Sequence, residues 1–302
     1  MKNVVYVKNR YFVSTKENSF RFYDLVKKEE KYIPFDDVSI LIFEHRNSFF
    51  SMKLINTCVK ENILLLFCDE KHSPLVLFSN VYGQNQRMKK LKSQLAISSK
   101  AKKRIWRKIV IGKINNQADC LIQVAKKVDE GKMLQLVGKQ VEDGDVTNRE
   151  AYAARRYFLF LFGNDFKRGR YSDLVNSCLN YGYALLRAVI RKELVIHGLE
   201  PSWGIHHEST ENPFNLSDDL IEPFRPFVDL LVYENFQGKD TEILDDEGKK
   251  SLFQIFFTRC VIDGKVYSVA DAILVMVNSY LACLEKDSAS PLKIPIFAAG
   301  GI

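Results

Sequence analysis

The stretch Arg87-Met-Lys-Lys-Leu-Lys-Ser-Gln-Leu-Ala-Ile-Ser-Ser-Lys-Ala-Lys-Lys-Arg-Ile-Trp-Arg-Lys108 lies where the residue pattern of this chain changes. Upstream of it, apolar and polar residues alternate with a period of two, as around Phe20 and Phe22, which predicts short β-strands. From about Gln84 the apolar residues recur at helical spacing, and the next proline is Pro201. The chain is therefore predicted to change from strands to helices at this point.

Two domains are expected from this change of pattern. A chain of 302 residues is long enough to bury a large apolar core and to form two domains. We expect an α+β fold, in which a β-rich, β-sandwich-like domain over residues 1–83 precedes a larger all-α domain over residues 84–302. Residues 286–302 include two prolines, and we expect them to form a tail that is irregular unless it docks on another part of the protein.

Local signals place some of the elements. A helix is expected near residues 51–59, before a buried strand within residues 61–69. Two longer helices are expected over residues 148–162 and 173–196. The pair Asp263-Gly264 is typical of a tight hairpin turn.

The composition excludes several classes of protein. Hydrophobic residues make up 46% of the chain and charged residues 27%, which is typical of a globular protein. The longest apolar runs, residues 63–68 and 272–277, are far shorter than the roughly 20 residues of a membrane-spanning helix. The six cysteines form no Cys-x-x-Cys pair, which argues against a disulfide framework or a zinc ribbon. We therefore expect a cytoplasmic protein that is not embedded in a membrane.

The opening stretch is also the most basic part of the chain. It contains no acidic residue and ten basic ones, namely Arg87, Lys89, Lys90, Lys92, Lys100, Lys102, Lys103, Arg104, Arg107 and Lys108. A polyanion gains free energy by releasing condensed counterions on such a surface. The alternative is an ordinary solvated helix face. The basic stretch points to DNA only if a site for phosphate chemistry lies nearby, and its DNA-binding candidates are Lys100, Lys102, Lys103, Arg104 and Arg107.

A dense polar cluster supplies candidates for that chemistry. The motif Gly204-Ile-His-His207 is followed by Asn212-Pro-Phe-Asn-Leu-Ser-Asp-Asp-Leu-Ile-Glu-Pro-Phe-Arg-Pro226. Asp219 and Glu222 are three residues apart, so on a helical turn they face the same way and could share a cation. The alternative is that Asp219 and its neighbours cap a helix while Glu222 faces solvent.

Glu150 is the natural candidate for a further ligand. The small residues that follow it, Ala151, Ala153 and Ala154, allow another segment to approach its helix closely. The alternative is that Glu150 closes a capping box with Thr147. A histidine with carboxylates suits Mg²⁺ or Mn²⁺ better than a structural zinc ion. Such an ion can activate an attacking hydroxyl group and neutralise a reacting phosphate.

At these residues the chain resembles CRISPR-associated protein one, the integrase family of spacer acquisition. The resemblance spans the whole chain, and the versions that accompany type II systems are the most similar. Its motifs, in chain order, are Asn148-Arg-Glu-Ala-Tyr-Ala-Ala-Arg-Arg-Tyr-Phe158, Asn176-Ser-Cys-Leu-Asn-Tyr-Gly-Tyr183, Gly198-Leu-Glu-Pro201 and the block from Gly204 to Asp229.

The resemblance implies a set of site residues. The metal ligands of the family fall on Glu150, His207 and Glu222, and Asp219 matches a supporting acidic position. Arg225 either contacts the reacting phosphate or pairs with a nearby acid. The resemblance also implies that the cofactor is Mg²⁺ or Mn²⁺ and that the same three residues are catalytic.

The resemblance also implies an activity and partners. The family joins the 3′-hydroxyl ends of captured DNA fragments to a CRISPR repeat by transesterification. It acts on double-stranded DNA as a homodimer whose β-rich domains pair, and two dimers flank a dimer of CRISPR-associated protein two, with other type II CRISPR proteins as further partners. Two alternatives remain open at this point: a metal-dependent, structure-specific DNA nuclease that does not join ends, and a non-catalytic DNA-binding scaffold.

Overall fold

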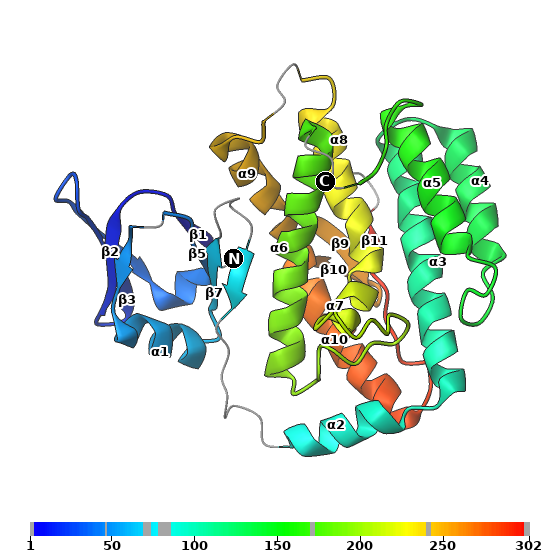
Figure 1. Ribbon diagram of the computed structural model, residues 1–302, viewed down its shortest axis with the longest axis horizontal. Coiled ribbons are helices and arrows are strands. Elements are labelled where there is room, and N and C mark those ends of the chain that lie inside the picture. Colours follow the sequence, from blue (N-terminus) through cyan, green and yellow to red (C-terminus); the bar gives the residue numbers. More distant parts are fainter. Residues whose placement is uncertain are drawn as a thin grey trace. The chain divides into compact units, whose positions relative to one another are not determined.

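The computed structural model describes residues 3–45, 47–68, 74–77, 86–169, 173–239 and 243–298. The chain divides into two compact units, residues 1–85 and residues 86–302 (Figure 1). The first unit is rich in strands and the second is mostly helical, so the expected α+β fold class is confirmed. No helix in the described part of the chain is long and apolar enough to cross a membrane.

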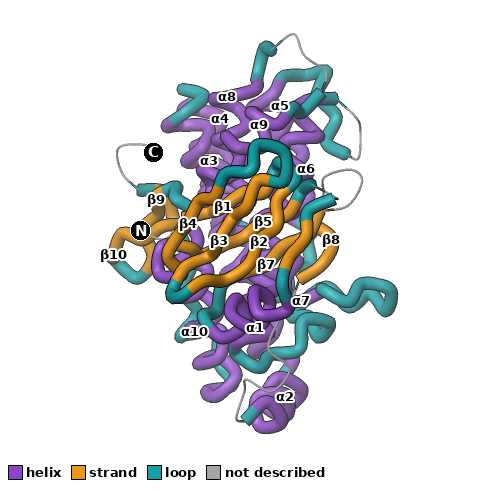
Figure 2. Tube along the Cα trace, turned by 90° about the vertical axis from the view of Figure 1, so that its left-hand side faces the viewer, coloured by secondary structure: helices purple, strands orange, loops and turns teal. Residues whose placement is uncertain are grey.

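The first unit contains two four-stranded sheets, drawn in orange in Figure 2. One sheet has the order β1-β5-β7-β8, in which β1, β5 and β7 run parallel and β8 antiparallel; the other has the order β4-β3-β2-β6. The strands are β1 (Asn3–Val7), β2 (Tyr11–Lys16), β3 (Ser19–Asp24), β4 (Glu30–Pro34), β5 (Val38–Phe43), β6 (Phe49–Phe50), β7 (Leu64–Cys68) and β8 (Pro74–Leu77). The short 3-10 helix η1 (Phe35–Asp37) precedes β5.

The core of this unit follows from the alternation seen in the sequence. Along β3 every second side chain is buried, starting at Phe20. These side chains pack with Val13 of the same sheet and with Leu41 of the other sheet, together with Leu54 of helix α1 (Met52–Lys60). Alternate apolar residues on the two sheets therefore build one shared core.

The second unit is built around the long helix α3 (Ser99–Gln123), which contacts α4, α5, α8 and the short helix η2. Its helices are α2 (Arg87–Ala96), α4 (Val128–Lys139), α5 (Arg149–Phe162), α6 (Leu174–Ile196), α7 (Asn215–Leu220), α8 (Arg225–Phe236), α9 (Asp246–Leu252) and α10 (Val269–Lys286), with η2 (Glu222–Phe224) and η3 (Phe253–Phe256). Because α3 has neighbours on several sides, even its polar residues Lys113, Asn116 and Gln117 are buried. These three residues shape the candidate site.

The expectation of an all-α second domain is wrong in one respect. A three-stranded sheet of order β10-β9-β11 lies among the helices, formed by β9 (Arg259–Ile262), β10 (Lys265–Ser268) and β11 (Ile296–Phe297). The predicted turn at Asp263-Gly264 joins β9 to β10, and both residues have the positive φ that a two-residue hairpin needs.

The C-terminal segment docks on the helical unit. Strand β11 pairs with β9, and the ring of Phe297 packs 4.2 Å from that of Phe227. The buried amide of Asn116 donates hydrogen bonds to the carbonyls of Pro295 and Pro223, which joins this segment to η2. Residues 294–297 thus brace the helices that hold the candidate site, whereas residues 299–302 lie outside the described part of the chain.

Candidate active site

The loop that contains the two histidines is held by the carboxylate of Asp219. This side chain on α7 is fully buried, with 0% of its surface exposed. One oxygen accepts hydrogen bonds from the backbone amides of Ile205 and His206, at 2.6 and 3.0 Å. The other accepts from the backbone amide of His207 and from its Nδ1, at 3.2 and 2.7 Å.

Asp219 therefore does something that neither sequence interpretation proposed. It does not cap α7, which begins after Phe214 without a side-chain cap. Instead, both of its oxygens accept hydrogen bonds from the histidine loop. An Nδ1–H that donates to a carboxylate fixes the tautomer of His207 and leaves the Nε2 lone pair as an acceptor or ligand. The same carboxylate raises the pKa of His207, and this effect outweighs the lowering caused by partial burial.

The two adjacent histidines have different surroundings. The ring of His206 lies parallel to the buried indole of Trp106, with ring centroids 4.3 Å apart. The ring of His207 meets the same indole edge-on and lines a cavity of about 700 Å³ together with Lys102 and Trp203. His206 thus packs on α3, whereas His207 is oriented by Asp219.

Two further residues anchor this loop to the helices before it. The buried amide of Gln94 on α2 donates to the carbonyls of Glu200 and Trp203 and accepts from the backbone amide of Glu200. Lys102 donates to the carbonyl of Gly204, and its ammonium group lies 5.1 Å from the ring centre of Trp203. The loop therefore depends on α2 and α3 for its position.

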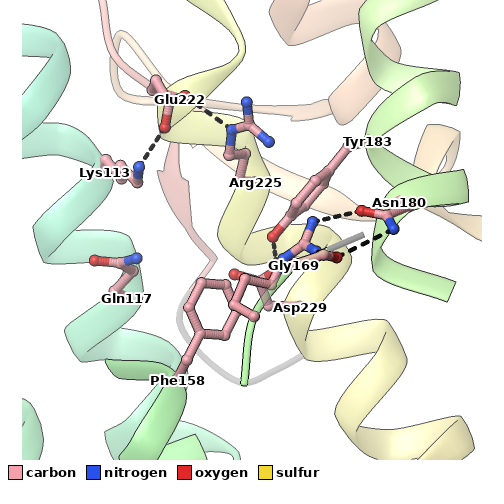
Figure 3. Close-up of a pocket in the computed structure, with 10 residues that line it drawn as sticks. Lys113, Gln117, Phe158, Gly169, Asn180, Tyr183, Glu222, Arg225 and Asp229 are labelled. Carbon is pink, nitrogen blue, oxygen red and sulfur yellow. Dashed lines mark hydrogen bonds and ion pairs between the residues drawn. The ribbon is translucent and has the colours of Figure 1, made fainter. Parts of the chain in front are cut away.

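A second cluster of side chains surrounds the ammonium group of Lys113, which the carboxylates of Glu150 and Glu222 both contact. Lys113 comes from α3 and forms ion pairs with Glu150 of α5 and Glu222 of η2. Glu222 also accepts a hydrogen bond from Nε of Arg225 at 2.9 Å (Figure 3). Burial raises the pKa of Glu222, but Arg225 and Lys113 lower it more strongly, so that its pKa falls to about 2. Burial likewise lowers the pKa of Lys113, and the two glutamates reverse that effect and raise it.

The capping box expected at Thr147 and Glu150 is not formed. Helix α5 begins after Asn148, whose φ is positive and whose side chain makes no cap. Asp145 takes the capping role instead, because its carboxylate accepts from the backbone amides of Arg149 and Glu150. The side chain of Glu150 is therefore free to reach Lys113.

The histidine loop with Asp219 and the second cluster around Lys113 lie close together, but they do not form one compact group of side chains. Glu222 is near enough to contribute to the raised pKa of His207. Among the residues that the structure describes, no three His, Cys, Asp or Glu side chains are grouped closely enough to hold a metal ion. The donor types nevertheless suit a divalent ion: two carboxylates already meet on a cation, and the Glu222 oxygen in that ion pair makes no hydrogen bond of good geometry.

A polar cavity of about 390 Å³ adjoins the second cluster (Figure 3). Its lining residues are Lys113, Gln117, Phe158, Arg168, Gly169, Asn180, Tyr183, Glu222, Arg225 and Asp229. The hydroxyl of Tyr183 donates to Asp229, and the guanidinium of Arg225 lies 4.6 Å from the ring centre of Tyr183. Burial raises the pKa of Asp229 to about 6, against smaller opposing contributions from Tyr183 and Arg168.

The DNA-binding candidates differ in what they contact. Arg104 and Arg107 form ion pairs with Asp143, and Lys102 holds the histidine loop. Lys100 and Lys103 are exposed on the first turns of α3.

Sequence reasoning missed Lys113, which the structure places at the centre of the second cluster. A signal was present, because Lys113 is the one charged residue in the apolar run Ile109-Val-Ile-Gly-Lys-Ile114. A lysine inside such a run must either extend to solvent or be paired. The roles of Gln94 and Trp106 had no comparable signal, because their partners are about 100 residues away in sequence.

We predict that replacing Gly204 by Ala destabilises the protein. A Cβ atom at this position would lie 2.2 Å from the carbonyl oxygen of His207 and 2.9 Å from the carboxylate of Asp219. We expect a loss of roughly 1–3 kcal/mol in the free energy of unfolding, measured by urea denaturation. The matched control is Gly138→Ala in helix α4, where the nearest atom to the new Cβ is the side-chain oxygen of Asn115 at 3.3 Å, which needs to shift only slightly, and where alanine favours the helix. Equal stability of the two variants would argue against this tight loop.

We also predict a pH-dependent gain in stability for Asp229→Asn. Because the pKa of Asp229 is about 6 in the folded protein and 3.8 ordinarily, the folded state binds its proton more tightly. The wild type therefore loses stability as the pH rises from about 4 to about 6, by at most about 3 kcal/mol, and the amide does not. The difference between variant and wild type in urea unfolding should grow over this range and stay constant above it. A difference that does not change with pH would contradict the prediction.

Comparison with known proteins identifies the family to which the chain belongs. The model of the family described as CRISPR associated protein Cas1 matches residues 5–256. The CRISPR-associated endonuclease Cas1 of Neisseria meningitidis serogroup C is 36% identical over 268 residues, which cover 88% of each chain. Its counterpart from Francisella tularensis subsp. novicida is 29% identical and covers 72% of this chain and 76% of its own length.

Solved structures have the same fold. A CAS1 protein from Thermotoga maritima superposes with a TM-score of 0.73 at 19% identity and covers 94% of this chain and 97% of its own. A casposase bound to its integration product superposes with a TM-score of 0.76 at 19% identity and covers 95% of this chain and 92% of its own. With the family model spanning most of the chain and the Neisseria relative 36% identical, this protein belongs to the Cas1 family.

Proposed function

We propose that this protein is a metal-dependent DNA integrase of CRISPR adaptation, which joins the 3′-hydroxyl ends of captured DNA fragments to a CRISPR repeat. The observation that supports it most directly is the meeting of Glu150 and Glu222 on one cation, next to an imidazole oriented by Asp219. In a member of the Cas1 family this arrangement suits phosphate chemistry at a divalent ion. The casposase with a similar fold is described as bound to an integration product, which favours joining over cutting alone.

The residues proposed to hold Mg²⁺ or Mn²⁺ are Glu150, Glu222 and His207, the last through Nε2. When bound, the ion would activate the attacking hydroxyl and neutralise charge on the phosphate. Asp219 keeps the imidazole in one tautomer and one orientation. Arg225 holds the carboxylate of Glu222 and adds positive charge at the same place.

The proposed reaction is a transesterification. The 3′-oxygen of the incoming fragment forms a new bond to a repeat phosphorus atom, and the bond from that phosphorus to the 3′-oxygen of the repeat strand breaks. The proton of the attacking hydroxyl is lost, and the leaving oxygen gains one. Hydrolysis by the same site differs only in that water attacks. Because the similar proteins of Neisseria and Francisella are described as endonucleases, cutting without joining is the second candidate.

The proposed partners are double-stranded DNA, a second copy of this chain and Cas2. The dimer would form through residues 1–83, and two such dimers would flank a Cas2 dimer in an assembly of four and two subunits. A solved Cas6-RT-Cas1–Cas2 complex contains a chain that covers 97% of this one with a TM-score of 0.71, of which this chain spans 36%. That likeness supports the Cas2 partnership, and other type II CRISPR proteins are proposed as further partners.

The ligand assignment predicts which substitutions abolish strand transfer. Glu150→Ala, His207→Ala and Glu222→Ala each remove a proposed ligand, so integration into a repeat-bearing plasmid at fixed Mn²⁺ should be lost. His206→Ala is the matched control, because its ring stacks on Trp106 and is not held by Asp219. It should retain most of the activity, and thermal melts should show that all four variants fold. Activity in His207→Ala together with none in His206→Ala would show that the ligand assignment is wrong.

The exposed lysines of α3 predict a change in the salt dependence of DNA binding. If Lys100 and Lys103 contact phosphates, Lys100→Ala/Lys103→Ala should weaken binding equally for unrelated sequences. The slope of log affinity against log salt should flatten by roughly one for each lost contact. Lys132→Ala on α4 is the control, because it removes an exposed charge close to the other end of α3. An unchanged slope in the double variant would show that this surface does not bind DNA.

A further inference from the structure

Lys113 occupies the place where the proposed ion would meet its carboxylates. Only 6% of the residue is exposed, and its ammonium group pairs with both Glu150 and Glu222. A buried ammonium group is favoured when it is paired, and two carboxylates at close quarters need either a cation or a shared proton between them. Lys113 and the two glutamates therefore stabilise one another while no divalent ion is bound.

A divalent ion would upset this balance. Lys113 and Arg225 supply two positive charges against the two negative charges of Glu150 and Glu222. With the ion added, four positive charges would face two negative ones in a buried region, where like charges repel strongly. The arrangement regains balance if the ammonium group of Lys113 moves away as the ion arrives.

The cavity beside Lys113 offers a place for that movement. Gln117 lies one turn further along α3 and lines the same cavity of about 390 Å³, as Figure 3 shows. Its buried Oε1 has no hydrogen-bond partner within the described part of the chain. A buried amide oxygen without a partner is uncommon, and it is an acceptor of the kind that an ammonium group needs.

We infer that Lys113 is a built-in counter-ion: it holds Glu150 and Glu222 together before the divalent ion binds, and it moves toward Gln117 when the ion takes its place. Lys113 is thus a positioning residue. The inference rests on the proposed function, because it takes Glu150 and Glu222 as metal ligands. As a consequence, the ion must displace the ammonium group of Lys113. This displacement lowers the affinity of the site for the ion, but the two carboxylates are already held together before the ion binds.

The test measures Mn²⁺ binding by calorimetry in Lys113→Met, which keeps an unbranched side chain one atom shorter and removes its charge. We expect Mn²⁺ to bind at least tenfold more tightly than to the wild type. The metal-free variant should melt at a lower temperature, and Mn²⁺ should raise its melting temperature by more than it raises that of the wild type. Lys132→Met removes an exposed charge from α4 and should match the wild type. Unchanged or weaker Mn²⁺ binding in Lys113→Met would overturn the inference.

A second measurement separates displacement from a general effect of charge. Gln117→Leu removes the proposed acceptor, so it should weaken Mn²⁺ binding when Lys113 is present and have no effect in the Lys113→Met background. The same effect in both backgrounds would refute the proposed movement. If Lys113→Met does not fold, Lys113→Met/Glu150→Gln restores the charge balance and should fold; failure of that double variant to recover would also refute the counter-ion role.

Glu222→Gln distinguishes failure of this inference from failure of the proposed function. If Glu222→Gln binds Mn²⁺ as the wild type does, the proposed ligand set itself is wrong. If Glu222→Gln loses Mn²⁺ binding while Lys113→Met gains none, the metal site stands and the role of Lys113 does not.

Discussion

The buried ion pairs of Lys113 are the constraint on which the candidate site depends. An unpaired ammonium group inside the helical unit would cost several kcal/mol of stability, or the lysine would lose its proton. Glu150 and Glu222 must therefore come to Lys113, and they come from α5 and η2, which are more than 70 residues apart in sequence. Removing one partner of such a cluster is far more damaging than exchanging the whole cluster for apolar residues. Keeping these charges inside thus costs stability, and that cost is understandable only if the site uses them.

The histidine loop also contains a buried charged group, and this group is stabilised in a different way. Here the buried group is the carboxylate of Asp219, and four N–H donors of one short loop satisfy it. This requirement explains the spacing of the motif, because three successive amides and one ring nitrogen can meet a single carboxylate only if the chain folds tightly around it. Gly204 permits that close approach. The residue pattern of the motif therefore reflects the hydrogen bonding of Asp219 as well as the placement of the proposed ligand His207.

The sequence predicted the elements better than the contacts between them. Strand alternation around Phe20, helix α5 and the hairpin at Asp263-Gly264 follow from local rules, and the structure contains them. The role of Asp145 as the N-terminal cap of α5 escaped prediction, because Thr147 offers an equally good local pattern. The pairing of β11 with β9 escaped it as well, because two residues of strand in a proline-containing segment have no periodicity to read. For the site, the acidic residues and the histidine could be named, but Lys113 could not be joined to them without knowing how α3 packs.

The two clusters differ in how much they can adjust. His207 is held by a fully buried carboxylate, and its loop is fastened by Gln94 on one side and packed on Trp106 on the other, so its position is set by several independent contacts. Glu150 and Glu222 have long side chains that both contact the long side chain of Lys113, beside a cavity. A small movement of Lys113 therefore changes which positive charge lies between the two carboxylates. The proposed reaction, in which a metal ion, a DNA end and a second strand would enter the site in turn, would gain from this combination. In that reaction the rigid imidazole would set the geometry, and the adjustable carboxylates would accommodate changes of charge as the reaction partners enter and leave.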